Sequence, residues 1–159
     1  SNRKRVICIA GDGSIMLNIQ ELQTIIGYSL PIKIFVLNNS GYHSIRQTQK
    51  NHFSTNPAVG VGPDSGLTFP DFRKLAKSFG FKHWSIKSTS EMVSVLKRTL
   101  DTDGSGICEV VLDLKQEFSP KLSSRKLEDG SMISSSLENM SPFLSKKELE
   151  ENMLVDLDK

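Results

Sequence analysis

Two short apolar runs, each followed at once by a polar turn, constrain the fold of this chain more than any other feature of its sequence. Residues 6–10 (VICIA) are continuously apolar and residues 31–37 (PIKIFVL) are apolar except for Lys33, which is typical of strands buried on both faces in a parallel sheet. Parallel neighbours need a long crossover connection, and the residues between the runs leave room for a helix and a turn. The sequence therefore predicts an α/β fold, a parallel sheet flanked by helices.

The turn after the first run is Gly-Asp-Gly, at residues 11–13. A helix is expected after it, because apolar residues from Ile15 to Ile26 keep roughly helical spacing and residues 18–21 (NIQE) resemble a capping box. In open α/β sheets, ligands collect at the carboxyl ends of strands, where a helix N-terminus attracts phosphate. Asp12 would repel phosphate unless a divalent cation lay between them, so the pattern indicates Mg²⁺, although Gly-Asp-Gly is also a common turn.

The second run ends in two adjacent carboxamides, Asn38 and Asn39. A buried amide is costly unless its donors and acceptors are satisfied, so we expect these side chains to bond to something. The carboxyl ends of parallel strands lie at the same edge of a sheet. Asp12 and Asn39 can therefore converge on one ion.

A family resemblance rests on these residues. GDGS followed by NN resembles the cofactor signature of thiamine diphosphate-dependent enzymes. The wider stretch, residues 11–49 (GDGSIMLNIQELQTIIGYSLPIKIFVLNNSGYHSIRQTQ), resembles the diphosphate-binding domain of the acetolactate synthase and 2-oxo acid decarboxylase group. The resemblance is specific over residues 5–49, looser to about residue 113, and weak in the tail.

The resemblance implies a Mg²⁺ site and a cofactor site. Asp12 and Asn39 would bind Mg²⁺ through their side chains and Gly41 through its carbonyl, with diphosphate oxygens and a water completing an octahedron. Gly13 would let the backbone approach the diphosphate, and Ser14 would donate to it. Asn38 would brace the turn rather than touch the metal. The cofactor-binding residues that the resemblance assigns are Gly11, Asp12, Gly13, Ser14, Asn39, Gly41 and Tyr42.

The implied function is that of an enzyme with thiamine diphosphate and Mg²⁺ as cofactors, acting on a 2-oxo acid by acetolactate synthase-like carboligation. A 2-oxo acid decarboxylase of the same family remains an alternative, because Thr48 stands where many acetolactate synthases carry an aromatic residue. A non-enzymatic nucleotide-binding α/β module is a further alternative. A Rossmann nucleotide site would need Gly-x-Gly-x-x-Gly after its first strand, and the stretch GDGSIM lacks the third Gly. A phosphoaspartate receiver would carry acidic residues and a phosphoacceptor Asp at its strand ends, and Asn38 and Asn39 do not fit that pattern.

Parts of the family pattern have no counterpart in residues 1–10. The family's diphosphate domain begins with a strand and a helix ahead of GDG, and a separate pyrimidine-binding domain supplies a catalytic Glu. We therefore expect a fold incomplete at its N-terminus and a chain that is the C-terminal part of a larger, homo-oligomeric enzyme. The pyrimidine-binding domain would come from the missing part or from another subunit. No catalytic residue is expected in this chain, which alone should bind cofactor weakly, if at all, and be inactive.

The rest of the chain continues the α/β alternation. We expect a helix over residues 69–79, with Pro in its first turn and Gly80 as its stop, and a strand over residues 82–86. A capping box at residues 88–91 predicts a helix to about Leu100, and a last core strand should cover residues 107–112. This gives four strands and three main helices.

The domain boundaries follow from a change in composition. Residues 3–113 should form the diphosphate- and Mg²⁺-binding domain, and residues 114–159 a polar linker with a short C-terminal helix. Residues 115–136 are rich in Ser and Lys and are predicted to be extended, while Ser145 should cap a helix that runs to Met153.

Composition limits the remaining function classes. The formal charge of +2 gives no basic stripe for nucleic acid. Cys8 and Cys108 are far from any C-x-x-C spacing and should be small buried residues of core strands in a reducing compartment. No long apolar stretch or signal sequence is present, so we expect a cytoplasmic protein that contacts no membrane.

Three further side chains are weaker candidates. His43 follows the turn that carries Asn39 and Gly41 and could reach a phosphate, but the first turn of a helix is also an ordinary place for a solvated His. Glu21 is better explained as a residue that braces the start of a helix. Arg46 belongs to the stretch SIRQTQ, which corresponds to VRQW in acetolactate synthases.

Overall fold

The computed structural model describes residues 4–53, 59–122, 124–126 and 129–154. Its contacts divide the chain into two compact units, Ser1–Gln116 and Glu117–Lys159. The first unit contains the sheet and every residue of the predicted site, and the second contains the tail. Each unit is described by itself.

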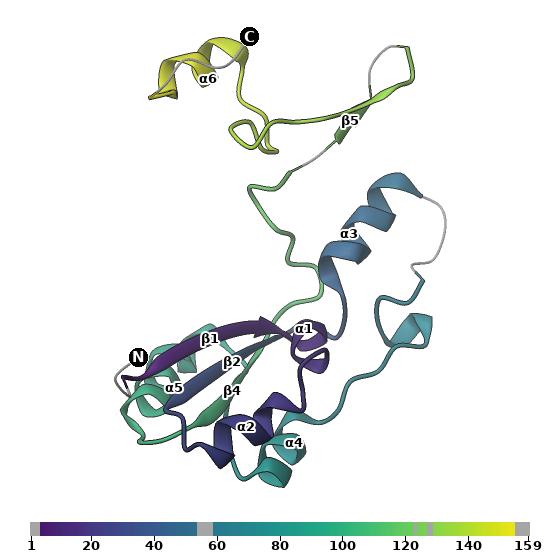
Figure 1. The fold of residues 1–159 in the computed structure, drawn as a ribbon. Coiled ribbons are helices and arrows are strands. Elements are labelled where there is room, and N and C mark those ends of the chain that lie inside the picture. Colours follow the sequence, from purple (N-terminus) through teal and green to yellow (C-terminus); the bar gives the residue numbers. More distant parts are fainter. Residues whose placement is uncertain (1–3, 54–58, 123, 127–128, 155–159) are drawn as a thin grey trace. The chain divides into compact units, whose positions relative to one another are not determined.

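A four-stranded parallel sheet forms the centre of the first unit (Figure 1). The strands are β1 (Val6–Gly11), β2 (Ile32–Asn38), β3 (Lys82–Ile86) and β4 (Gly106–Val111), in the order β1-β2-β4-β3. The register pairs Gly11 with Leu37, so β1 and β2 end at the same edge. The predicted parallel α/β fold is confirmed.

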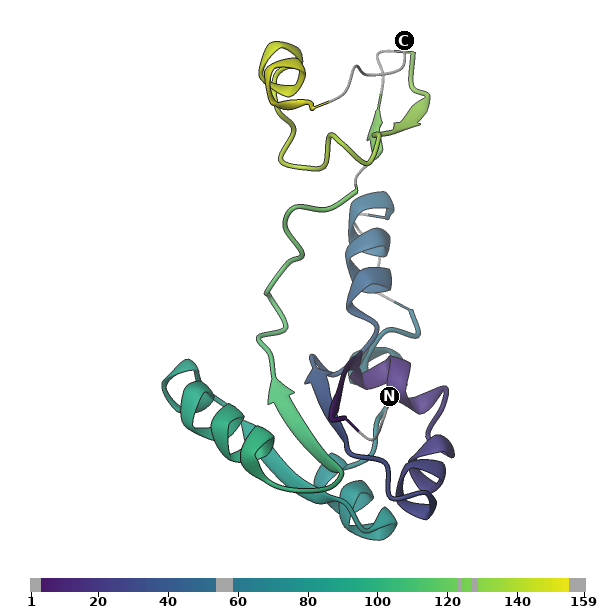
Figure 2. The same cartoon turned by 60° about the vertical axis from the view of Figure 1, so that its left-hand side comes forward.

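Helices cover both faces of this sheet. The helices of this unit are α1 (Asp12–Met16), α2 (Glu21–Gly27), α3 (His43–His52), α4 (Phe72–Phe79) and α5 (Thr89–Asp101), with a short 3₁₀ helix η1 (Pro63–Ser65). Helix α3 projects away from the sheet (Figure 1). In Figure 2, α5 lies on one side of the sheet and α2 on the other. Residues of α1, α2 and α4 pack on one face and residues of α5 on the opposite one.

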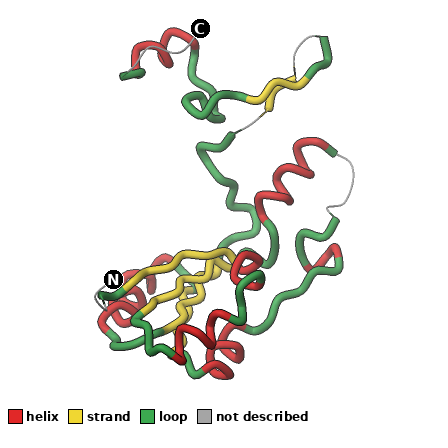
Figure 3. The backbone as a smooth tube through the Cα atoms, in the orientation of Figure 1, coloured by secondary structure: helices red, strands yellow, loops and turns green. Residues whose placement is uncertain are grey.

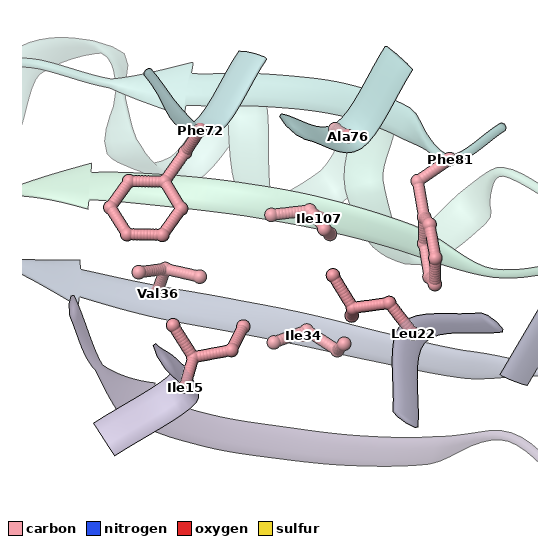
Figure 4. Close-up of a cluster of buried hydrophobic side chains, with 8 residues drawn as sticks. All are labelled: Ile15, Leu22, Ile34, Val36, Phe72, Ala76, Phe81 and Ile107. Carbon is pink, nitrogen blue, oxygen red and sulfur yellow. The ribbon is translucent and has the colours of Figure 1, made fainter. Parts of the chain in front are cut away.

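Alternate residues of the central strands supply the two cores, because successive side chains of a strand point to opposite faces. Ile34, Val36 and Ile107 pack with residues of the helices on the first face, as Figure 4 shows. The remaining members of this cluster are Ile15, Leu22, Phe72, Ala76 and Phe81. Phe35 and Cys108 point the other way and pack against Ile86 and Val95.

The first predicted strand differs from the expectation in its burial. Val6 to Ile9 are exposed, with 68% of Ile9 accessible, and Cys8 is exposed while Cys108 is buried. The prediction of a strand buried on both faces, and of a buried Cys8, is therefore wrong. The reason is position: within the described residues β1 lies at an edge of the sheet and pairs only with β2.

Two helix starts also differ from the expectation. Helix α1 follows β1 without a loop and begins at Asp12 (Figure 3), and α2 begins at Glu21, where the side chain of Gln20 makes no capping bond. The capping box predicted at residues 18–21 is wrong, because backbone turns already join the two helices. Helix α4 begins at Phe72 rather than at residue 69, because Asp71 is its N-cap and accepts the N–H of Lys74 at 2.9 Å.

The second unit contains a hairpin and a helix. Strands β5 (Ser124–Lys126) and β6 (Met132–Ser134) are antiparallel, so the segment predicted to be an extended linker is partly a hairpin; residues 123 and 127–128 lie outside the described residues. The turn forms because Gly130 takes a φ of 85° and Asp129 accepts the N–H of Ser131. Helix α6 (Lys146–Asn152) is capped by Ser145, as predicted.

A search of the described helices found none that is both long enough and apolar enough to cross a bilayer.

The first testable prediction concerns the core. Ile107 is fully buried between the helices and the sheet. Ile107→Ala should lower the free energy of unfolding by about 2–5 kcal/mol, because it removes buried methyl groups and leaves a cavity. Val93→Ala on α5, where 75% of the side chain is exposed, is the control and should change it by less than about 0.5 kcal/mol. Urea denaturation measures both, and equal losses would contradict this assignment of the core.

Candidate functional site

The predicted metal-binding side chains lie at one edge of the sheet. Asp12 directly follows β1 and opens α1, and Asn39 directly follows β2. Because β1 and β2 are parallel neighbours in register, both residues stand at the carboxyl ends of these strands. This is the edge at which open α/β sheets bind ligands.

The Asp12 carboxylate is buried, with 1% of the residue exposed. Its Oδ1 accepts the N–H of Gly13 at 2.8 Å, and its Oδ2 accepts the N–H of Gly41 at 2.9 Å. Within the described part of the chain no cationic side chain forms an ion pair with it. Burial raises the pKa of the Asp12 carboxyl, and the N–H groups of Gly41 and Gly13 oppose part of this rise. A bound cation would favour the charged form in this position.

Asn39 presents a buried amide oxygen at the same edge. Among the described residues, its Oδ1 has no hydrogen-bond donor. An orphaned buried carbonyl is costly, and such an atom in a native fold calls for an explanation such as a ligand. The amide oxygen of Asn39 and the carboxylate of Asp12 are both hard oxygen donors, the type that Mg²⁺ takes.

The turn that carries Asn39 is held from several sides. Asn38 Oδ1 accepts the N–H of Ser40 at 3.0 Å, and Ser40 adopts a positive φ of 54°. Arg46 on α3 donates through Nη2 to the carbonyls of Ser40 at 3.3 Å and Val61 at 3.2 Å. The predicted bracing role of Asn38 agrees with this geometry.

Gly41 and Gly13 stand where a side chain would not fit. Gly41 has a φ of 154°, and a Cβ there would overlap the carbonyl oxygen of Val61. A Cβ on Gly13 would run into the ring of Tyr42, coming within 2.7 Å of its Cδ1. The Tyr42 ring meets Phe69 edge to face, with centroids 6.0 Å apart. These close approaches fix the turn at residues 38–41 and Tyr42 against Val61 and α1.

The other predicted residues take varied positions. Ser14 is exposed in the first turn of α1, close to Gly11. His43 is buried at the start of α3, so the expectation of a solvated His at this position is wrong. Glu21 is exposed at the start of α2, and Thr48 is exposed on α3.

Sequence reasoning missed two residues of this neighbourhood. Val61 is buried and accepts the N–H of Tyr42 at 2.9 Å, so the segment that follows α3 returns to support the turn after β2. Glu109 on β4 accepts Nδ2 of Asn38 at 2.6 Å. The glycines around Val61, in the stretch VGVG, are the one sequence signal that could have indicated a close backbone approach.

Comparison with known proteins identifies the family. Residues 1–110 match the family described as "Thiamine pyrophosphate enzyme, C-terminal TPP binding domain". This chain belongs to the thiamine pyrophosphate enzyme family. The resemblance stated from GDGS and NN is thereby confirmed, and the family's domain binds the cofactor that the resemblance implied.

Acetolactate synthases are among the relatives of this thiamine pyrophosphate-binding domain. The large subunit of Pyropia yezoensis is 38% identical over 99 residues, which are 62% of this chain and 16% of the relative. That of Buchnera aphidicola subsp. Schlechtendalia chinensis is 37% identical over 128 residues, 80% and 21% of the two chains. The isozyme 2 large subunit of Escherichia coli (strain K12) is 35% identical over 108 residues, 68% and 19%. The chain thus spans about a fifth of the relatives it matches.

A solved structure has the same fold. The thiamine diphosphate-dependent 4-hydroxybenzoylformate decarboxylase of Rhodococcus jostii RHA1 is similar with a TM-score of 0.61 and 26% sequence identity. The match covers 74% of this chain and 21% of the decarboxylase. It supports the thiamine diphosphate-binding α/β fold.

The second testable prediction concerns Gly41. Gly41→Ala should lower the free energy of unfolding by about 2 kcal/mol or more, because it combines an unfavourable φ with a clash against a backbone carbonyl. Gly27→Ala at the end of α2 is the matched control, since a Cβ there meets nothing within 4 Å. The control should be neutral or slightly stabilising. Thermal and urea unfolding compare the two, and a Gly41→Ala variant as stable as the control would refute the described loop conformation.

Proposed function

We propose that this domain anchors the diphosphate of thiamine diphosphate through a Mg²⁺ ion bound by Asp12, Asn39 and the carbonyl of Gly41. The main support for this proposal is that two buried oxygen donors with incomplete partners lie at the same edge of the sheet. Among the described residues, the buried Asp12 carboxylate has no cationic side chain as a partner, and the buried Oδ1 of Asn39 has no hydrogen-bond donor. One divalent cation would remedy both.

Charge and donor type support Mg²⁺ over a softer metal. The donors proposed are one carboxylate and two neutral oxygens, and among the described residues no cluster of three or more His, Cys, Asp or Glu side chains is present. Hard oxygen donors suit Mg²⁺, which keeps room in its shell for phosphate oxygens and water. A full set of protein ligands is therefore not needed.

The diphosphate itself would rest on the start of α1. The exposed Ser14 lies there and can donate through its hydroxyl and its N–H, beside the half-buried Gly11. The Tyr42 ring, packed on Gly13, would limit the cofactor's sideways movement. Fixed positioning of this kind contributes substantially to lowering a reaction barrier.

The bound cofactor would supply a nucleophilic carbon and an electron sink for chemistry on a 2-oxo acid. The residues of this chain hold and orient it. The acetolactate synthase relatives support carboligation as the reaction. The structural similarity to a decarboxylase keeps decarboxylation as the second candidate.

The proposal includes parts that lie outside this chain. A pyrimidine-binding domain would supply the catalytic Glu, from the same protein or from another subunit of a homo-oligomer. The chain by itself would then bind cofactor weakly and show no turnover. The cytoplasm is the proposed location.

The third testable prediction separates the two side-chain ligands. Asp12→Asn removes the single charged ligand, whereas Asn39→Ala removes a neutral oxygen that water can replace. Asp12→Asn should raise the Mg²⁺ concentration needed for half-maximal cofactor binding by about tenfold or more, since a bond to a charged group is worth about 1.5–3 kcal/mol. Asn39→Ala should raise it less. Calorimetric titration with millimolar thiamine diphosphate at several Mg²⁺ concentrations measures this ranking.

Asp101→Asn serves as the control for loss of one negative charge, because Asp101 is exposed on α5 and pairs with Lys97. It should leave the Mg²⁺ requirement unchanged. If Asp12→Asn bound the cofactor as the parent chain does, Gly-Asp-Gly would be a turn and nothing more. Tighter binding with NAD than with thiamine diphosphate would favour the nucleotide-binding alternative instead.

A further inference from the structure

Three hydrogen bonds connect strand β4, the turn after β2 and the Asp12 carboxylate. Glu109 Oε1 accepts Nδ2 of Asn38 at 2.6 Å, and Asn38 Oδ1 accepts the N–H of Ser40 at 3.0 Å. The next N–H, that of Gly41, donates to Asp12 at 2.9 Å. These bonds therefore run from the neighbouring strand, through the turn, to the buried carboxylate.

The sheet register explains why Glu109 can reach the turn. Glu109 is paired with Val36, and Asn38 lies two residues further along β2 on the same face. Glu109 and Asn38 are thus diagonal neighbours across two parallel strands, within reach of a long side chain. On its other side, Oε2 of Glu109 lies 3.8 Å from Nε2 of His83 on β3, which is beyond hydrogen-bond distance.

Glu109 and His83 are both largely buried beside a cavity. The side chain of Glu109 is 18% exposed and that of His83 is 13% exposed. Both line a cavity of about 620 Å³ at the carboxyl ends of β2, β3 and β4, together with Asn38 and Arg73. Burial lowers the pKa of His83, while the Glu109 and Asp71 carboxylates act in the opposite direction.

The turn needs this support because its backbone conformation is unfavourable. Ser40 has a positive φ of 54°, a conformation that is energetically unfavourable for any residue with a side chain. Gly41 follows with a φ of 154°. The strand ends at Asn38, so the turn has no ladder of its own. The Asn38 amide supplies a bond to the Ser40 N–H, and the bond from its other end to Glu109 limits the rotation of this amide.

We propose that Glu109 is a positioning residue of the metal site. It fixes the Asn38 amide, which fixes the turn that presents Asn39 and Gly41 beside Asp12. Glu109 itself does not bind the ion. This inference rests on the proposed function for the identity of the ion, but the bracing of the turn does not depend on any ligand.

A carboxylate suits this role better than a neutral amide. The 2.6 Å contact between Glu109 and Asn38 is short, as charge-assisted hydrogen bonds are. Glu109→Gln keeps an oxygen that can accept from Asn38 but loses the charge, so it should retain part of the effect. Glu109→Ala removes the acceptor altogether.

The first part of the test measures the Mg²⁺ requirement for thiamine diphosphate binding in the chain. Glu109→Ala should raise the Mg²⁺ concentration at half-maximal binding about tenfold, as expected for the loss of a hydrogen bond to a charged group. Asn38→Ala should have a similar effect, and the double variant should be no worse than either single one. Glu109→Gln should lie between Glu109→Ala and the parent chain.

Glu91→Ala is the matched control. Glu91 is also a carboxylate that accepts a hydrogen bond, from the N–H of Ser88 at 3.1 Å, but it lies at the start of α5 and away from the turn. Its loss should reduce the thermal stability of the chain and change the Mg²⁺ requirement by less than about twofold. An equal shift in Glu91→Ala and Glu109→Ala, or strictly additive effects in the Asn38 and Glu109 double variant, would overturn the positioning role.

The second part of the test uses no cofactor and distinguishes failure of this inference from failure of the proposed function. Hydrogen exchange of the Ser40 and Gly41 amides is followed by NMR in the metal-free chain. Glu109→Ala should speed exchange at both by about tenfold or more, with amides of α5 unchanged. Unchanged Ser40 and Gly41 exchange would overturn the inference whatever the cofactor results. Absence of cofactor binding by the parent chain would overturn the proposed function instead, while faster exchange would still support the bracing.

Discussion

The structure of this domain depends on one buried carboxylate that joins two strand ends. Asp12 receives an N–H from its neighbour Gly13 and another from Gly41, which lies across the sheet edge after β2. A carboxylate in such a place costs energy that backbone donors offset only in part, as the raised pKa of Asp12 indicates. A cation bound as proposed would offset the rest of this cost, and the family of this chain binds thiamine pyrophosphate through this domain.

The elements around Asp12 can be understood as supports for this junction. The parallel register brings Gly11 and Leu37 level, so the two turns emerge side by side. Val61 and Arg46 hold the second turn from the side of α3, and Glu109 holds it from β4 through Asn38. Strand β4, helix α3 and the segment around Val61 all contribute to the conformation of residues 38–41. This conformation therefore depends on the whole fold and not on a local sequence motif alone.

The sequence indicated those features that follow from local patterns, and it failed where long-range contacts decide. The parallel sheet and the N-cap at Ser145 follow from apolar runs and a capping residue, and both are observed. The exposure of Cys8 could not be read from its apolar neighbours, because it depends on which strand lies at the edge. Likewise Glu109 lies far from Asn38 in sequence, and only the order of the strands brings them together.

The central claim is that one cation lies between Asp12, Asn39 and Gly41 when the cofactor is bound. Mn²⁺ can replace Mg²⁺ at sites with hard oxygen ligands, and it broadens the NMR signals of nuclei close to it. We therefore would titrate Mn²⁺ with thiamine diphosphate into isotopically labelled protein. The account predicts selective broadening of the Gly13, Asn39 and Gly41 amides that needs the cofactor and is lost in Asp12→Asn. Broadening centred on another part of the chain, or broadening that persists in Asp12→Asn, would contradict it.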